Sequence, residues 1–235
     1  MFGNPQDGCK KLRLDIFKRA GADFISLIIF VFSRLSHKHL PPPWKIIFID
    51  PYAISESIEP SNHVRKGRHR LSGLVRRSDW ERVIPMPTKH HVMPTLFREL
   101  FFNKHPEIPA HSDKDTAETL DRLRETIDIE RYRGICESMR AEGFERPRFA
   151  TSRHDAFSVC IDKDGQLLFT TGKHRLALAK ALGLSKIPVR VSARHIQWVR
   201  YRQAFYQRLV ADRLNKIDKQ HWKHPDLQDL IQRAG

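Results

Sequence analysis

Apolar and polar residues alternate along one stretch in the C-terminal half of the chain. Phe157, Val159 and Ile161 alternate with smaller or less apolar residues, residues 163–165 read Lys-Asp-Gly, and apolar residues resume at 167–170. Alternation with a period of two is typical of a strand, and Asp-Gly favours a tight turn. The pattern therefore predicts a β-hairpin.

A helix and a further strand are predicted directly after this hairpin. Residues 173–182 are rich in Ala and Leu, Gly183 follows them, and "KIPVRV" at 186–191 returns to an apolar, β-branched texture. Glycine commonly terminates a helix, and a short β-branched run favours a strand. We expect a compact strand-helix-strand unit with a buried helix.

The rest of the chain adds one strand and several helices, which predicts a mixed α+β fold. We expect a buried strand at 45–49 and helices at 95–102, 115–127 and 129–143. From Ala193 the pattern predicts a long helix in which aromatic residues follow helical spacing. The stripe consists of Trp198, Tyr201, Phe205 and Leu209. We interpret it as a core-packing face rather than a base-stacking platform.

Three prolines at 41–43 set the first boundary, because they cannot continue a helix. We therefore divide the chain into a basic and apolar helical N-terminal appendage (1–43), a central domain (44–192) and a C-terminal helical tail (193–235). With 235 residues and 40% apolar composition, the chain can bury a substantial core.

Charge narrows the choice of partner. The formal net charge is +15, which favours phosphate-bearing partners: a nucleotide or phosphorylated small molecule, a nucleic acid or an anionic membrane surface. No Asp or Glu occurs between Gly165 and Ala211, whereas nine Lys or Arg do. The three cysteines lack the paired spacing of a zinc or thiol redox site, so we expect no metal site of that kind and a cytoplasmic location.

An apolar run near the N-terminus has two interpretations. The run "FISLIIFVF" at 24–32 is too short to span a bilayer as a helix, and no secretory signal pattern precedes it. Basic residues flank it on both sides, which suits peripheral contact with an anionic membrane through residues 10–38. The alternative, which we favour at this stage, is a helix packed against the rest of the protein.

The junction between the predicted hairpin and helix is the best candidate for a functional site. Gly172 would let the backbone approach a ligand, and the first amides of the following helix would point outward without partners. Lys173 and Arg175 would neutralise a phosphate there, and His174 would orient it or donate to it. A second basic cluster is a candidate for polyanion contacts: Arg65, Lys66, Arg68 and Arg70.

The sequence "TTGKHRLALAKALG" followed by "KIPVRV" resembles the ParB/sulfiredoxin superfamily. In that superfamily a Gly-x-His/Arg-Arg motif opens the helix before a strand that begins Ile-Pro-Val. The matching positions are Gly172, His174, Arg175, Ala177, Ala179, Ala181, Leu182, Gly183, Ile187, Pro188 and Val189. The closest resemblance covers 157–191, and a looser one extends back to Lys45 if 61–114 is a long insertion.

The resemblance implies a small mixed sheet with packed helices and a bound nucleotide phosphate, with ATP or CTP and Mg²⁺ as cofactors. Family members include sulfinic-acid reductases, nucleotide-hydrolysing DNA clamps, small-molecule kinases and proposed nucleases. The reductases carry their essential cysteine where this chain has Lys173, so cysteine-dependent reduction is excluded. The kinases need carboxylates; Asp155, Asp162 and Asp164 lie nearby in sequence, and the last two suit the hairpin turn.

Three functional hypotheses remain, and the third is a domain that associates with a membrane surface through the N-terminal helix. The first is a nucleotide-phosphate binder, with hydrolysis or phosphoryl transfer as its chemistry if it is an enzyme. The second is a non-catalytic nucleic-acid binder that uses the basic cluster and the arginines of the tail helix. The segment around Asp79 and Trp80 also resembles uncharacterised members of the superfamily, but that resemblance assigns these residues no role.

Overall fold

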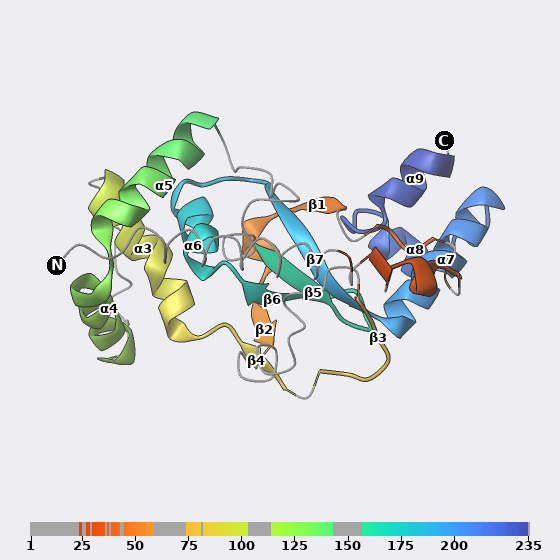
Figure 1. Cartoon of the computed structure of the whole chain (residues 1–235), viewed down its shortest axis with the longest axis horizontal. Coiled ribbons are helices and arrows are strands. Elements are labelled where there is room, and N and C mark those ends of the chain that lie inside the picture. The colour runs from red at the N-terminus through yellow and green to blue at the C-terminus, as the bar shows by residue number, and fades with distance from the viewer. Residues whose placement is uncertain are drawn as a thin grey trace, which may run out of the picture.

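Figure 1 shows a central sheet with one group of helices at each end. A computed structural model describes these residues: 24, 27–28, 30–35, 37, 39–42, 45–58, 74–80, 82–102, 114–142 and 157–234. Helices α3 to α6 lie at one end of the sheet, and α7 to α9 lie at the other (Figure 1). The fold is mixed α+β, as the sequence predicts.

The strands form one mixed sheet of seven. Their bounds are β1 Ile46–Ile49, β2 Glu56–Ile58, β3 Leu74–Arg76, β4 Val83–Pro85, β5 Ser158–Ile161, β6 Leu167–Thr171 and β7 Ile187–His195. The order is β1-β7-β5-β6-β2-β4, and β3 also pairs with β7. β7 is antiparallel to β1 but parallel to β5 and β3. The longest strand therefore organises the sheet.

The predicted hairpin is confirmed as β5 and β6. The Asp162 carboxylate accepts hydrogen bonds from the backbone N–H of Asp164 at 2.9 Å and of Gln166 at 2.7 Å. Gly165 has a φ of 91°, and a Cβ there would lie 2.5 Å from the ring of Trp198. The turn therefore needs both its aspartate and its glycine, and Asp162 serves the turn.

The strand after the predicted helix is longer than expected. It continues past Val191 to His195, so the prediction of a helix from Ala193 is wrong for its first three residues. β3 pairs with Ala193, Arg194 and His195, and this pairing keeps them extended. The His195 side chain then accepts from the N–H of Gln197 at 3.2 Å and caps the next helix.

The helices agree with the predicted ones in number and place through the middle of the chain. Their bounds are α3 Thr88–Phe102, α4 Lys114–Thr126, α5 Ile129–Glu142, α6 Lys173–Ala181, α7 Ile196–Val210, α8 Lys216–His221 and α9 Gln228–Ala234, with a 3₁₀ turn, η1, at Pro51–Ala53. α3 begins earlier than predicted, and two short helices follow α7. α3 and α6 pack together through a core that includes Met93, Phe97 and Leu178.

The described parts of 61–114 belong to the body of the protein. They supply β3, β4 and α3, which join the sheet and its helical cover. The C-terminal tail is equally integrated, because Leu227 and Leu230 lie in the main core. Of the N-terminal appendage, Phe30 and Leu40 are buried together with Val199 of α7.

Candidate functional site

Gly172 stands between β6 and α6, where the sequence places the candidate site. Its φ is 93°, in the left-handed region that favours glycine. A Cβ at this position would lie 2.9 Å from the Cα of Phe157. The close approach that the glycine permits is therefore to the protein's own Phe157. No side chain caps the start of α6, so its first amides are available to a ligand.

His174 is held by Tyr132 of α5. The Tyr132 hydroxyl lies 2.9 Å from Nδ1 of His174, and the two rings are 4.5 Å apart. Burial raises the pKa of Tyr132, so the phenol keeps its proton. With the phenol as donor to Nδ1, the neutral imidazole carries its proton on Nε2, where it could donate to an anion.

Two histidines at this site are kept neutral. Burial and nearby cations lower the pKa of His174 to about 4. The cations are Lys173, Arg131 and Lys89. His90 of α3 behaves in the same way: burial, Lys89 and Lys173 lower its pKa to about 4. The described groups that shift these two pKa values are Lys, Arg and His side chains, so they add positive charge to the effect of burial.

The first turns of three helices meet here. His90 lies in the first turn of α3, Arg131 in that of α5 and His174 in that of α6. Helix N-termini carry partial positive charge, so cations there raise the local potential further. α3 and α6 have no acid in their first turns. Two acids stand at the start of α5. Glu130 is exposed and pairs with Arg133 at 3.5 Å, and the Asp128 carboxylate accepts a hydrogen bond from the N–H of Arg131 at 3.1 Å.

Lys173 adds to the cationic side of the site, and Arg175 follows it two residues later in the first turn of α6. Both are partly buried, and neither makes a hydrogen bond or ion pair with any residue in the described ranges. Burial and the charge of Lys89 lower the pKa of Lys173. The structure thus places Lys173 and His174 beside Lys89, His90, Arg131 and Tyr132, which sequence reasoning missed. The predicted polyanion contacts Arg65, Lys66, Arg68 and Arg70 lie outside the described residues, as does Asp155.

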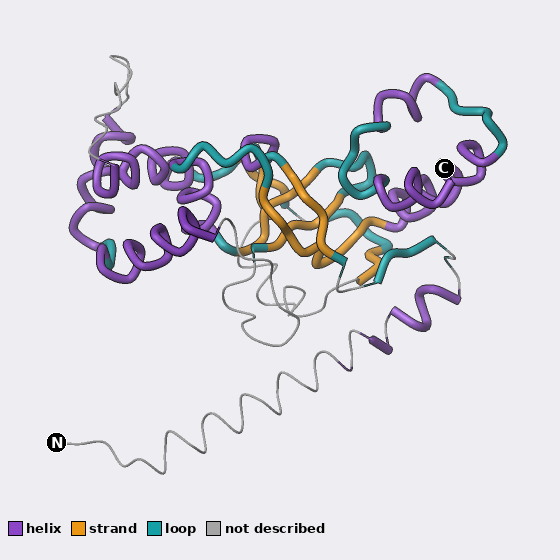
Figure 2. The backbone as a smooth tube through the Cα atoms, turned by 90° about the horizontal axis from the view of Figure 1, so that it is seen from above, coloured by secondary structure: helices purple, strands orange, loops and turns teal. Residues whose placement is uncertain are grey.

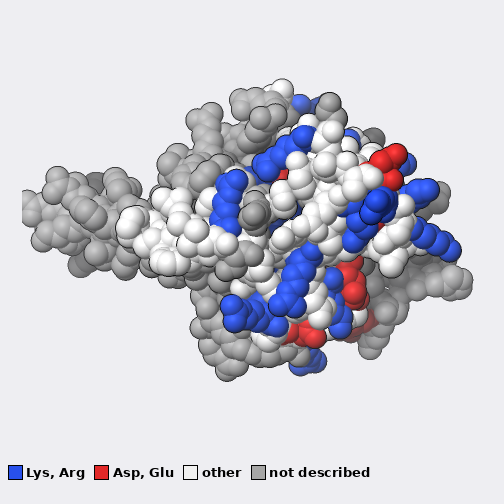
Figure 3. Space-filling model, turned by 90° about the vertical axis from the view of Figure 1, so that its right-hand side faces the viewer, with Lys and Arg blue, Asp and Glu red and all other residues white. Residues whose placement is uncertain are grey.

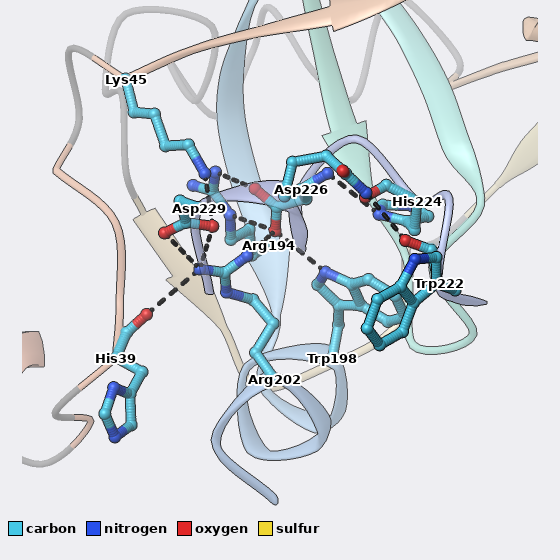
Figure 4. A network of polar contacts seen from close by, with 10 residues as sticks. His39, Lys45, Arg194, Trp198, Arg202, Trp222, His224, Asp226 and Asp229 are labelled. Carbon is cyan, nitrogen blue, oxygen red and sulfur yellow. Dashed lines mark hydrogen bonds and ion pairs between the residues drawn. The ribbon is translucent and has the colours of Figure 1, made fainter. Parts of the chain in front are cut away.

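The basic run of the C-terminal half has a different explanation at its far end. Arg194 and Arg202 are fully buried around Asp226, which is itself fully buried (Figure 4). Arg194 donates to both carboxylate oxygens of Asp226, at 3.0 and 2.7 Å. Arg202 lies 3.2 Å from Asp226 and donates to Asp229 at 3.1 Å. Burial would raise the pKa of Asp226, but the two guanidinium groups hold it well below its usual range.

The same network ties the C-terminal segment to the sheet. Trp198 donates from Nε1 to Asp226 at 3.0 Å, and the N–H of Asp226 donates to Nδ1 of His224 at 3.1 Å. Nε2 of His224 lies 2.8 Å from the carbonyl oxygen of Gly165 and therefore donates to it. Lys45, before β1, lies 2.6 Å from Asp229. Figure 4 shows these side chains converging from three parts of the chain.

Arg208 is also paired within the protein. It donates to both oxygens of the buried Asp218 at 2.6 Å, and Tyr201 donates to the same carboxylate at 3.0 Å. The expectation that the tail-helix arginines hold nucleic acid is therefore wrong for Arg202 and Arg208. Their charge is already matched by acids that follow Ala211 in the sequence.

Asp79 and Trp80 follow β3 and make side-chain contacts with Arg76 of β3 and His195 of β7. The guanidinium of Arg76 lies 4.9 Å from the ring of Trp80 and donates to the carbonyl oxygens of Ser78 and Asp79. Nε2 of His195 lies 3.2 Å from the Asp79 carboxylate. Nδ1 of His195 accepts from Gln197, so the proton on Nε2 points to Asp79.

Two hollows lie away from the start of α6. One of about 320 Å³ lies between α3 and α5, and a larger groove of about 860 Å³ runs beside β1 and α9. Neither of these two is lined by described residues of α6. Within the described ranges, no group of three or more His, Cys, Asp or Glu is placed to share a metal ion. No family model, curated protein or solved structure matches the chain.

Proposed function

We propose that this chain is a ParB/sulfiredoxin-like protein that binds a nucleotide through its phosphates at the start of α6. The order hairpin, Gly172, α6 and β7 is the order that the resemblance implies, and it supports this finer fold assignment. The bound phosphate would accept hydrogen bonds from the first amides of α6. Arg175 and Lys173 would neutralise it, and the Nε2–H of His174 would donate to it.

One observation carries the proposal. His174 and His90 are half-buried beside Lys173, Lys89 and Arg131, and nearby cations add to burial in lowering the pKa of both histidines. An acid in the first turn would stabilise a helix start, and α3 and α6 have none there. The cluster instead keeps its positive potential, which is the property that a phosphate-binding site requires.

Hydrolysis or phosphoryl transfer would use the same cations. Charge neutralisation and positioning carry most of the catalysis in phosphoryl transfer. Mg²⁺ would arrive with the nucleotide and would share its phosphate oxygens. Release of inorganic phosphate from ATP and CTP, measured with and without Mg²⁺, tests this part of the proposal. No release in either condition would limit the function to binding.

Calorimetric titration of ATP, CTP and GTP tests the binding itself. We expect at least one nucleotide to bind the wild type, and we expect Arg175→Ala to weaken that binding by about 10- to 100-fold, because charge-assisted hydrogen bonds contribute about 1.5–3 kcal/mol. Lys173→Ala should weaken it by a smaller factor.

Arg213→Ala is the matched control. It removes the same charge from an exposed position that has no ion pair to the described chain. It should bind as the wild type does. An equal loss in Arg175→Ala and Arg213→Ala would mean that only net charge attracts the nucleotide. Affinity weaker than about 1 mM for all three nucleotides would refute the proposal.

A further inference from the structure

The N-terminal helical residues expose a stripe of large apolar side chains. Its described members are Phe24, Leu27, Ile28, Val31, Phe32 and Leu35. Their spacing of three and four residues places all of them on one face of a helix. Exposure is highest at the end of the stripe, where 68% of Phe32 and 77% of Leu35 are open to solvent. A continuous exposed apolar face of this kind is typical of a binding surface.

The opposite face of this helix is attached to the body of the protein. Phe30 is buried with Leu40 and Val199, so the helix touches α7 through a different side from the stripe. In Figure 2 the described helical residues lie to one side of the sheet, towards the end where α7 to α9 lie. The sequence-based choice of a helix packed on the protein thus holds for Phe30 but leaves the stripe uncovered by any described residue.

Three exposed arginines lie near the C-terminal end of this helix. Arg34 is exposed on the same helix, with its guanidinium 5.6 Å from the ring of Phe30. Arg77 and Arg200 act on His37, just after the helix, and with burial as the main cause they lower its pKa. Both arginines are exposed. Lys and Arg predominate over Asp and Glu on the face drawn in Figure 3.

We propose that this stripe docks the protein on an anionic membrane surface, with Phe32 and Leu35 inserted among the acyl chains. Arg34, Arg77 and Arg200 would lie at the level of the lipid headgroups, where each cation contributes through attraction to anionic lipid. A second copy of this chain is a poorer occupant, because it would bring the same three cations against one another. Among the described residues, no helix is long and apolar enough to cross a bilayer.

Vesicle flotation of the full chain tests this proposal. The vesicles contain phosphatidylcholine alone or phosphatidylcholine with phosphatidylglycerol. We expect flotation with the anionic vesicles, a strong decrease at high salt, and little flotation with the zwitterionic vesicles. The double variant Phe32→Asn, Leu35→Asn should bind at least about tenfold more weakly, because it removes two insertable side chains.

The matched control is Val210→Asn, Ile217→Asn. These apolar residues are 62% and 55% exposed but lie at the end of α7 and in α8. The control should float as the wild type does, and both variants should keep the wild-type circular dichroism. Equal flotation of the stripe variant and the control would overturn the proposal, as would equal binding of the wild type to both vesicles. Sedimentation adds a second test: a wild-type dimer that the stripe variant converts to a monomer would assign the stripe to self-association instead. None of these outcomes depends on the nucleotide site.

Discussion

Asp226→Ala is expected to be the most damaging single change in the C-terminal network. Asp226 accepts two hydrogen bonds from Arg194 and one from Trp198, and it also faces Arg202. Alanine would leave two fully buried guanidinium groups without their common anion. Water cannot replace that anion, because the arginine side chains are closed to solvent.

The magnitude follows from this burial. Removing one partner of a buried ion pair costs about 3–5 kcal/mol, since the remaining charge stays desolvated. Asp229 still pairs with Arg202, so we expect the lower half of this range. In a chain of 235 residues, a loss of that size lowers Tm by roughly 6–16 °C. The folded pKa of Asp226 is depressed, so its stabilisation is present above its unfolded pKa and is lost only as pH falls through the much lower folded value.

Urea denaturation at neutral pH measures this loss, with Asp121→Ala as the matched control. Asp121 pairs with Arg124 at 2.7 Å, but its side chain is 71% exposed. The control should lose less than about 1 kcal/mol, because water screens an exposed pair. Equal losses in the two variants would refute the reasoning that burial makes the network strong. Asp226→Ala combined with Arg202→Met should recover part of the loss, because methionine carries no charge.

Three further outcomes are expected. Gly172→Ala should lower the free energy of unfolding by about 2–3 kcal/mol, and Gly183→Ala should lower it by about 1 kcal/mol. Both glycines have a positive φ, but only at Gly172 would a Cβ lie against neighbouring atoms. Urea denaturation of the two variants measures the difference. Sulfate should bind more tightly as pH falls from 6.5 towards 4. A bound anion raises the pKa of His174 and His90, so anion binding is coupled to proton uptake. Calorimetry at several pH values measures the affinity, and an affinity that does not change with pH would contradict this. Tyr132→Phe should raise the pKa of His174 from about 4 by less than about one unit, since one hydrogen bond is lost while burial stays; an NMR titration of the ring measures the shift.

Local patterns predict the hairpin and α6 because their causes lie within a few residues. The alternation at Phe157 to Ile161 and the Asp162 turn need no distant partner. The extension of β7 has a distant cause, because β3 comes from a remote part of the chain. Three residues in β3 carry too short a pattern to predict that pairing. The prediction that the strand ends at Val191 is therefore wrong, because pairing with a remote strand extends it.

The candidate site shows the same division. Gly172 to Arg175 can be found from the sequence, because a glycine before a basic helix start is a local signal. Lys89 and Arg131 cannot, because only packing of α3 and α5 on α6 brings them near His174. A usable signal did exist, since both residues stand in the first turn of a helix, where cations are unfavourable. Cations in the first turn of a helix are thus a signal for a helix start whose charge would serve a ligand under the proposed function.

The basic segment from Lys173 to Arg208 divides into two electrostatic environments, and this division gives the candidate site its weight. Arg194 and Arg202 pair with Asp226 and Asp229, so their buried charges are neutralised and these residues stabilise the fold. At Lys173 no described carboxylate forms an ion pair, and burial and the charge of Lys89 lower the pKa of the lysine. If the two regions served the same structural purpose, both would carry carboxylates. The region around Lys173 keeps its positive charge at some cost in folding stability, and a bound anion should recover that stability. Sulfate or pyrophosphate should therefore raise the Tm of the wild type more than that of Lys173→Ala, in proportion to the logarithm of anion concentration once the site is saturated.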